Sequence, residues 1–351
     1  MNYAREAISR IAGYVPGEQP QGQPLIKLNT NENPYPPSPK VAEALREFDW
    51  QRLRLYSEPS AKMVREAAAK VYGVKPGQIL CGNGSDDLLT IALRTFVGEG
   101  EKLAYTEPSY SLYPVLADLQ GAVRQPVALN DSFDLEPDAW KQAADAKLFI
   151  FARPNAPTGT NLDKAAVCAV CENFKGVVWI DEAYVDFSGD NCLSLIDEYP
   201  NVVVSRTMSK SFSLAGLRLG IAFANEALIY EMNKVKDSYN VDMISQIVAT
   251  AALNDMAYMQ ANAARIRDTR DWLAAELTKI GCKVLPSCTN FLFVETKRPA
   301  GKVFQELKEA RYLVRYFNLP RISQYIRITI GKREDMEGFL KTITALDAKQ
   351  D

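Results

Sequence analysis

Residues 205–220 read SRTMSKSFSLAGLRLG and place a lysine, Lys210, among serines and threonines. An arginine, Arg218, follows it between leucines and glycines. The segment continues directly from NVVVS (201–205), an apolar run that we expect to form a buried strand. Polar residues ordered in this way just beyond a strand predict a site that holds an anion and an amine-reactive group.

Short apolar runs rich in valine, isoleucine and aromatic residues precede this segment. They are QILCG (78–82), KLAYT (102–106), AVRQPVAL (122–129), KLFIFA (147–152) and VVWID (177–181). Segments of helical or loop character separate them, and SDDLLTIALRTFV (85–97) is expected to be a helix with a serine cap and an acidic first turn. The alternation predicts an α/β fold with a mostly parallel central sheet.

The composition along the chain predicts three parts. Residues 1–40 are expected to form an N-terminal arm, because LIKLNTNENPYPPSPK (25–40) is rich in proline and lacks helical periodicity. Residues 41–235 contain the alternating strands and helices and are predicted to be a large domain. Long helical segments and two strand-like runs, TNFLFVE (289–295) and YIRITI (325–330), then predict a smaller C-terminal α+β domain over residues 236–351.

The composition of the 351-residue chain also excludes several classes of function. A net charge of −2 provides no basic surface for nucleic acid or an anionic membrane. The chain has no histidine, which removes histidine-ligated zinc and serine–histidine catalysis, and we expect no metal site. We recognise no signal-peptide pattern and no long apolar span, and six scattered cysteines fit a reducing compartment, so we expect a cytoplasmic protein. Cys168 and Cys171 form a CxxC pair inside an apparent helix, where core packing is the expected role.

Polar or aromatic residues follow five of the expected strands. GNGSDD (82–87) follows the first, where two glycines and a new helix suit a phosphate, although taken alone it also fits an ordinary turn. EPSYSLY (107–113), RPNAPTGT (153–160) and DEAY (181–184) follow three others, and the segment with Lys210 follows the last. Because ligands of open α/β sheets bind beyond the carboxyl ends of the strands, the five segments together predict one binding site.

Asp181 and Lys210 form the centre of this predicted site. Asp181 ends an apolar run, where an unpaired carboxylate is costly to bury, so it needs a cation or a protonated nitrogen nearby. Lys210 follows the next strand, and a lysine amine in the same crevice can act as a Schiff-base nucleophile. A pyridinium paired with an aspartate, a lysine imine and a phosphate at a helix N-terminus describe pyridoxal phosphate. The alternative, a structural Asp–Lys ion pair, leaves Arg218 and the glycine turn unexplained.

The motifs of this chain resemble those of the fold-type I pyridoxal-phosphate aminotransferases, and within them those of the histidinol-phosphate aminotransferases. The resemblance covers most of the chain and rests on YVPG (14–17), LNTNENPYPPSP (28–39), GNGSDDLL (82–89), EPSYSLY (107–113), PNAPTGT (154–160), DEAYVDF (181–187), SRTMSKSFSLAGLRLG (205–220) and LVRYFNLPRISQYIRITIG (313–331). The lysine segment is specific to the superfamily, whereas YVPG, NENPY and LVRYF with RITIG favour the histidinol-phosphate branch. The resemblance implies a homodimer that uses pyridoxal 5'-phosphate to move an amino group between L-histidinol phosphate and 2-oxoglutarate, in histidine biosynthesis.

The resemblance also implies roles for individual residues. Lys210 is the expected Schiff-base lysine and proton carrier, Asp181 the partner of the ring nitrogen, and Tyr184 the donor to the ring's 3-oxygen. Arg327 is the expected clamp for the anionic group of the substrate. The other expected cofactor contacts are Tyr110 on the ring face, Ser85, Asp86, Thr207, Ser209 and Arg218 at the phosphate, and Tyr56, which would reach the cofactor phosphate of the partner subunit. The other expected substrate-side residues are Arg315, Tyr14 and Asn33.

The sequence departs from the family's pattern in two places. The family has an asparagine directly before PTG, whereas this chain has Ala156 there and Asn155 one residue earlier. Either Asn155 contacts the ring's 3-oxygen from a shifted turn, or Tyr184 alone does. The stretch from Arg315 to Arg327 is one residue shorter than in some members of the family, so the resemblance supports the role of Arg315 less strongly than that of Arg327.

Three alternative functions stay open from the sequence. Two are activities of the same scaffold, an aromatic aminotransferase and a threonine-phosphate decarboxylase, because an arginine clamp accepts carboxylate and phosphate alike. The third is a pyridoxal-phosphate-binding regulator without turnover. Such regulators usually carry a DNA-binding module, for which this chain has no basic stretch.

Overall fold

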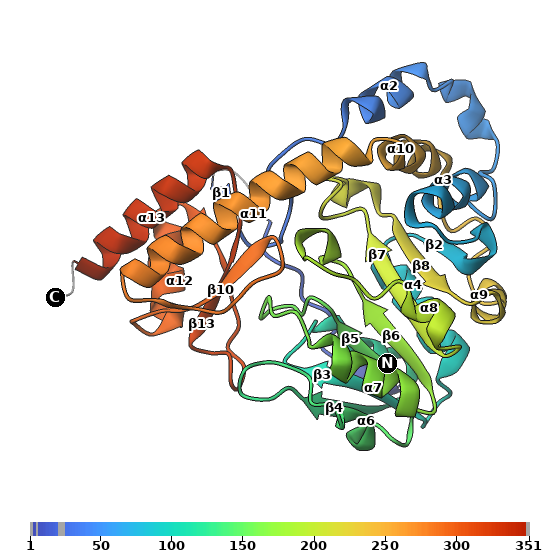
Figure 1. Ribbon diagram of the computed structural model, residues 1–351, viewed down its shortest axis with the longest axis horizontal. Helices are drawn as coiled ribbons and strands as arrows, with labels where there is room; N and C mark the ends of the chain where they lie inside the picture. The colour runs from blue at the N-terminus through green and yellow to red at the C-terminus, as the bar shows by residue number, and fades with distance from the viewer. Residues whose placement is uncertain (1–2, 5, 20–24, 349–351) are drawn as a thin grey trace.

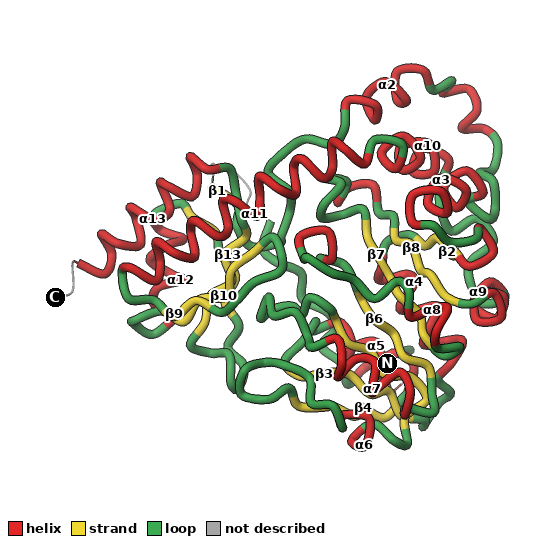
Figure 2. Tube along the Cα trace, in the orientation of Figure 1, coloured by secondary structure: helices red, strands yellow, loops and turns green. Residues whose placement is uncertain are grey.

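The computed structural model describes residues 3–4, 6–19 and 25–348. Residues 1–2, 5 and 20–24 of the predicted arm and residues 349–351 of the predicted C-terminal domain lie outside the described residues. The described part of the chain contains a large sheet and a small sheet, each covered by helices (Figures 1 and 2). The helices span Glu6–Ser9 (α1), Pro39–Glu47 (α2), Lys62–Tyr72 (α3), Ser85–Phe96 (α4), Leu112–Gln120 (α5), Ala139–Gln142 (α6), Lys164–Asn173 (α7), Leu195–Glu198 (α8), Glu226–Asn233 (α9), Met243–Leu253 (α10), Met256–Lys279 (α11), Ala300–Glu309 (α12) and Arg333–Ala348 (α13).

The large sheet has seven strands in the order β2-β8-β7-β6-β5-β3-β4. All neighbours are parallel except β8, which runs antiparallel to both β2 and β7. This confirms the predicted α/β class with a mostly parallel sheet, in which apolar runs covered on both faces form the strands. The strands span Ile79–Gly82 (β2), Lys102–Glu107 (β3), Val123–Ala128 (β4), Ala146–Ala152 (β5), Val177–Asp181 (β6), Val202–Thr207 (β7) and Gly220–Ala224 (β8).

Helices cover both faces of the large sheet, and successive strand residues pack on opposite sides of it. Leu148 and Ile150 of β5 belong to a core cluster with apolar residues of α4, α5 and α9. Phe149 and Phe151 of the same strand belong to the other cluster, with residues of α3, α7 and α8. The period of two in β5 therefore supplies both cores of a three-layer architecture.

The small sheet is antiparallel and has the strand order β12-β13-β10-β9. The long helix α11 connects the two parts, since it begins beside α10 near the large sheet and ends beside the small one (Figure 1). A segment near the N-terminus also joins the small part, where β1 (Ile26–Lys27) pairs in parallel with β11 (Tyr312–Leu313). The strands of the small sheet span Lys283–Val284 (β9), Phe291–Glu295 (β10), Arg315–Tyr316 (β12) and Tyr325–Thr329 (β13).

The division of the chain into parts at residues 40 and 235 stays a prediction. Helix α10 lies within the predicted C-terminal part, yet it packs against α2 and α3 beside the large sheet. Within the described residues, no helix has the length and apolar character needed to cross a membrane. Cys168 and Cys171 lie in α7, and both are free thiols.

The start of α4 differs from the sequence expectation. The N-cap residue is Gly84, and Ser85 is the first residue of the helix rather than its cap. Gly84 has φ +88°, a left-handed conformation that glycine adopts without strain. The glycine therefore turns the chain into the helix, and the serine hydroxyl is free for another role.

Candidate active site

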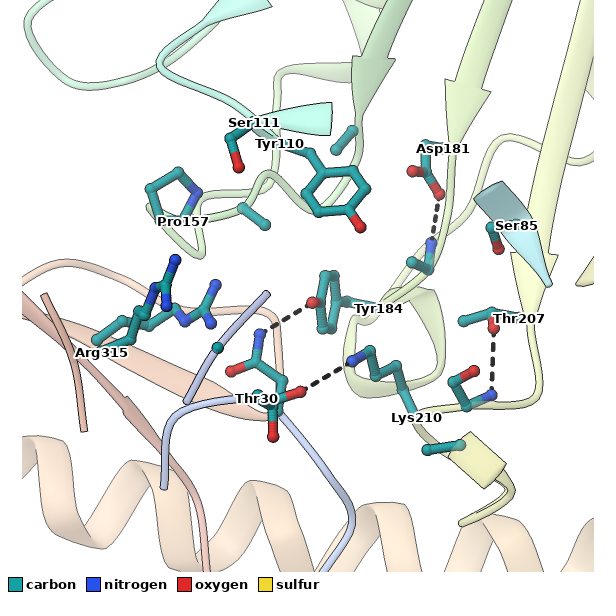
Figure 3. Close-up of a pocket in the computed structure, with 18 of the residues that line it drawn as sticks. Thr30, Ser85, Tyr110, Ser111, Pro157, Asp181, Tyr184, Thr207, Lys210 and Arg315 are labelled. Atoms are coloured by element: carbon teal, nitrogen blue, oxygen red, sulfur yellow. Dashed lines mark hydrogen bonds between the residues drawn. The ribbon is translucent and has the colours of Figure 1, made fainter. Parts of the chain in front are cut away.

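A cavity of about 240 Å³ lies at the carboxyl ends of the strands, between the large sheet and the small one (Figure 3). It brings together most of the side chains that the sequence singled out, from segments far apart in the chain. Those that line it are Tyr14, Ser85, Asp86, Tyr110, Asp181, Tyr184, Thr207, Ser209, Lys210, Arg218, Arg315 and Arg327.

The carboxylate of Asp181 is held at the end of β6 by a set of donors. The hydroxyl of Tyr113 donates to its Oδ2 at 3.0 Å, while Ser205 Oγ (3.4 Å) and the backbone N–H of Ala183 (3.2 Å) donate to Oδ1. Burial raises the pKa of Asp181 to about 6, and the hydrogen bond from Tyr113 opposes this rise. Asp181 therefore remains an anion near neutral pH and can stabilise a positive charge placed against it.

Lys210 lies in the loop beyond β7 and points into the cavity from the side opposite Asp181 (Figure 3). Its Nζ donates a hydrogen bond of 3.1 Å to the backbone carbonyl of Thr30. The same nitrogen lies 5.7 Å from the centre of the Tyr184 ring. The amine is thus held by a neutral acceptor and an aromatic ring. Asp181 and Lys210, both described residues, form no ion pair with each other, so the alternative of a structural Asp–Lys pair fails.

Polar side chains surround the N-terminus of α4 and form a cradle there. The hydroxyl of Ser85 is buried and has no hydrogen-bond partner in the described structure. Arg218 reaches the same place, with Nη2 3.3 Å from Asp86 Oδ2 and Nη1 3.4 Å from Ser209 Oγ. A Cβ on Gly84 would lie 2.5 Å from Arg218 Nη2, so the glycine makes room for the guanidinium. Helix N-terminal N–H groups, hydroxyls and a guanidinium together suit a phosphate dianion.

The cavity therefore fits pyridoxal phosphate. The unpartnered hydroxyl of Ser85 and the space left by Gly84 match a phosphate, and Asp181 matches a protonated pyridine nitrogen. Tyr110 also lines the cavity, and its hydroxyl donates to Asp86 Oδ1 at 3.4 Å. The residues that would hold the group are thus those at the strand ends of the large sheet.

Two arginines define the other end of the cavity. Arg315 and Arg327 are directly opposite each other on the antiparallel strands β12 and β13. Burial lowers the pKa of Arg327, and the charge of Arg315 lowers it further. Arg327 Nη2 donates to the carbonyl of Asn29 at 2.8 Å, but its buried Nε has no partner in the described structure. Like charges placed opposite each other are unfavourable, and an anion between them removes that cost.

Two tyrosines contribute to the wall between these ends. The ring of Tyr14 meets that of Tyr110 edge to face, with centroids 5.8 Å apart. Tyr14 is 40% exposed and so lies at the opening of the cavity. Phe317 also lines the space and carries both guanidinium groups over its ring, at 5.4 Å each. An aromatic substrate ring would therefore meet an aromatic wall.

Three of the residues expected at the site do not line this cavity. Asn155 is fully buried, and its amide is used by the carbonyl of Pro108 (3.0 Å) and by Thr158 (2.8 Å). The amide of Asn33 donates to the backbone carbonyls of Lys210 and Ser211, both at 3.1 Å, and so supports the lysine loop.

Tyr56 lies on the surface, 80% exposed, and stacks on Tyr239 with centroids 4.5 Å apart. It does not line the cavity of its own chain. Its predicted contact with a partner subunit stays a prediction.

Sequence reasoning missed three residues at the site. Asn31 donates to the hydroxyl of Tyr184 at 2.9 Å, Thr30 accepts from Lys210, and Tyr113 donates to Asp181. Asn31 lies in the quoted LNTNENP, but nothing in the sequence distinguishes its role from that of the neighbouring asparagines. Tyr113 lies in the quoted EPSYSLY, three residues after Tyr110 and at the start of α5, and this closeness to a predicted site residue was the available signal.

Comparison with known proteins places the chain in a class. A profile of the family described as aminotransferase class I and II matches residues 23–343. The crystal structure of histidinol-phosphate aminotransferase from Sinorhizobium meliloti, in complex with pyridoxal-5'-phosphate, shares this fold with a TM-score of 0.89 at 23% identity, over 99% of both chains. An aspartate aminotransferase of Thermus thermophilus also shares it, with a TM-score of 0.83 at 20% identity, over 98% of this chain and 99% of that one. The fold and the site thus define an aminotransferase of class I and II.

More similar sequences narrow the class. The histidinol-phosphate aminotransferase of Citrifermentans bemidjiense is 44% identical over 97% of this chain and 98% of its own length. That of Microcystis aeruginosa is 45% identical over 97% of both chains. The chain belongs to the histidinol-phosphate aminotransferase family.

Proposed function

We propose that this protein is a pyridoxal-phosphate-dependent aminotransferase that moves an amino group between L-histidinol phosphate and 2-oxoglutarate, a reaction of histidine biosynthesis. The observation that carries the proposal is one cavity with an amine at its centre, a phosphate cradle at one end and two arginines at the other. The relatives at 44–45% identity bear the name of this activity.

When bound, pyridoxal phosphate supplies a ring that takes up electrons from the substrate carbon carrying the amino group. Asp181 contributes a fixed negative charge that favours the protonated form of the ring nitrogen. Lys210 Nζ removes the proton from that substrate carbon and later returns a proton. The hydroxyl of Tyr184 serves as a donor at the ring's 3-oxygen, and Ser85 and Arg218 hold the phosphate.

The two arginines account for the use of two different substrates. L-Histidinol phosphate carries a phosphate at the end where glutamate carries a carboxylate, and both substrates use the site in turn. Guanidinium groups bind either anion in a planar, two-pronged contact. Arg327 has an unused Nε in this structure, and Arg315 lies across from it. The aromatic wall of Tyr14, Tyr110 and Phe317 would receive the imidazole ring.

The protein is a homodimer in this proposal, with Tyr56 of each chain reaching the cofactor phosphate in its partner. Support comes from the 3-10 helix Trp50–Arg54 and the residues after it, which expose large apolar side chains. Trp50 is 72% exposed, Leu53 56%, Leu55 51% and Tyr56 80%. An apolar surface of this kind marks an association site. The partners are then small molecules and a second copy of the chain, without nucleic acid or membrane.

The proposed location is the cytoplasm. All six cysteines of the chain are free thiols in the structure. Free thiols are typical of proteins from reducing compartments.

The proposed substrate is tested by comparing amino donors in steady state with 2-oxoglutarate as acceptor. We expect kcat/KM for L-histidinol phosphate to exceed that for phenylalanine and tyrosine by a factor of at least about 100, since its phosphate offers the two arginines up to two negative charges and three acceptor oxygens, whereas the carboxylate of the amino acids offers one charge and two oxygens. A higher value for phenylalanine or tyrosine would instead support the aromatic aminotransferase.

A further inference from the structure

Three consecutive residues near the N-terminus each contact a different polar group of the cavity. Residues 29–31 run beside the cavity between its two ends, and the close-up shows two of their contacts as dashed lines (Figure 3). A short segment is thus in contact with the proposed anion clamp, the proposed proton carrier and the proposed ring donor. The contacts are Asn29 O with Arg327 Nη2 (2.8 Å), Thr30 O with Lys210 Nζ (3.1 Å) and Asn31 Nδ2 with Tyr184 Oη (2.9 Å).

Asn31 is fixed more completely than its neighbours. It is 1% exposed and has φ +56°, a left-handed conformation that asparagine tolerates better than most residues. Its backbone N–H donates to Thr329 Oγ1 at 3.0 Å, and its carbonyl accepts from Asn290 Nδ2 at 3.0 Å. Its side-chain Oδ1 accepts from Thr329 Oγ1 at 3.0 Å. With the bond from its Nδ2 to Tyr184, each backbone and side-chain nitrogen and oxygen of Asn31 therefore has at least one partner.

This arrangement determines which way the amide of Asn31 faces. Thr329 is buried, its Oγ1 accepts the backbone N–H of Asn31, and among the described residues the acceptor of its single proton is the side-chain oxygen of Asn31. The oxygen of the amide must then face Thr329, and the NH₂ group must face Tyr184. A hydroxyl has one proton, and the oxygen of Tyr184 already accepts from Asn31. The proton of Tyr184 must then point elsewhere, and the open side of its hydroxyl is the cavity.

We propose that Asn31 is a positioning residue whose amide, oriented by Thr329, turns the hydroxyl proton of Tyr184 into the cavity. The inference rests on the proposed function, because the acceptor of that proton is the ring oxygen of the cofactor. Thr329 lies in β13 two residues after Arg327, so the strand that carries the anion clamp also sets the direction of the proton. If Asn31 only linked the segment to the sheet, the orientation of its amide would not matter.

The test uses the full-length protein loaded with pyridoxal phosphate and records its visible absorption as a function of pH. Asn31→Asp keeps the shape and the acceptor for Thr329, but replaces the donor facing Tyr184 with an acceptor. The hydroxyl of Tyr184 then turns toward the carboxylate, and the cofactor oxygen loses a donor that stabilises its anionic form. We expect the midpoint of the titration to rise by about one pH unit. Thr329→Val, which adds no charge, should raise the midpoint in the same direction, whereas Thr329→Ser, which retains the hydroxyl, should leave it unchanged.

A Tyr184→Phe background separates the orientation of the hydroxyl from the added charge. We expect Asn31→Asp to shift the midpoint by less than half as much in that background, because no hydroxyl remains to be turned. An equal shift in both backgrounds, or an unchanged midpoint in Thr329→Val, would overturn the role of Asn31. If the unaltered protein forms no visible band with pyridoxal phosphate, both the proposed function and this inference fail. If the band forms but the variants leave the midpoint of its pH titration unchanged, the inference alone fails.

Discussion

The carboxylate of Asp181 is buried, and burial of a charge is energetically unfavourable. The residue is 5% exposed, and burial raises its pKa to about 6 from the usual value of 3.8. Below pH 4 the group is protonated in both the folded and the unfolded chain, so it does not affect stability there. As the pH rises from about 4 to 6, the unfolded chain loses this proton first, and the folded state becomes less stable. The cofactor-free protein carries this cost at every higher pH.

Asp181→Asn should therefore stabilise the cofactor-free protein while it damages catalysis. We expect the free energy of unfolding at pH 7 to rise by up to about 3 kcal/mol, and its fall between pH 4 and 6 to be reduced. Turnover should decrease by a factor on the order of 10²–10³, because the charge facing the ring nitrogen is lost. Urea unfolding at several pH values and kcat measure the two effects.

Asp131→Asn is the matched control for this experiment, because the side chain of Asp131 is fully exposed. It should change neither stability nor turnover. An Asp181→Asn protein that is less stable at pH 7, or that retains near-normal turnover, would refute the role given to the carboxylate.

The positions of single residues were predictable where the local sequence pattern determines them. Asp181 is the last residue of the apolar strand β6, and Lys210 comes three residues after the end of β7, so their place at the sheet edge follows from the alternating pattern. The partners of these side chains were not predictable in the same way. Thr30 and Asn31 reach the site from a segment without regular structure, and their contacts join residues 180 and 153 positions apart in the chain. Such pairings depend on tertiary packing, which a local pattern does not specify.

At the level of elements, the junction between β2 and α4 controls the phosphate end of the site. The turn depends on Gly84, whose left-handed φ of +88° directs the chain into the helix and leaves Ser85 inside its first turn. The strand and the helix were predictable from apolar runs and an acidic first turn, but the cap was not. Serine is a common N-cap, and only the backbone conformation of Gly84 reveals that the cap lies one residue earlier.

Gly84→Ala should weaken cofactor binding. A Cβ there would lie 2.5 Å from Arg218 Nη2, and the backbone would be strained by about 1–2 kcal/mol. Displacement of the guanidinium should lower the affinity for pyridoxal phosphate about tenfold or more, as measured by equilibrium titration. Gly189→Ala is the control, because a Cβ at Gly189 would meet nothing within 4 Å. The affinity of this variant for pyridoxal phosphate should be unchanged. Equal affinities for the two variants would exclude this turn from the phosphate site.

At the level of the whole molecule, the exposed apolar residues around Tyr56 lie outside the cavity of their own chain. A two-fold dimer would bury the same surface of both copies at once, and one contact of Tyr56 with the partner implies its twin. The two-sheet architecture and its order along the chain were predictable from the sequence, since the alternation of strands and helices gives way to long helices after residue 236. Contact with a second copy of the chain produces no comparable sequence pattern, so the oligomeric state has to be measured.

Mixed dimers test whether the sites are shared. We expect Tyr56→Phe to reduce cofactor affinity by about 1.5–3 kcal/mol through loss of one hydrogen bond to a charged group, and Lys210→Ala to abolish turnover. A dimer with one chain of each variant has one site with both lesions and one with neither. Activity should therefore partly recover on mixing. Absence of recovery after proven subunit exchange, or a monomer in sedimentation at the working concentration, would contradict a shared site.

The central claim is that the cavity around Lys210 carries out amino transfer with L-histidinol phosphate as donor. The most direct measurement is the visible spectrum of the protein loaded with pyridoxal phosphate, after addition of L-histidinol phosphate without any 2-oxo acid. The account predicts that the visible band disappears in a single turnover and returns when 2-oxoglutarate is added, since the cofactor keeps the amino group until an acceptor arrives. An unchanged band at saturating L-histidinol phosphate, with phenylalanine or tyrosine abolishing it instead, would contradict the account.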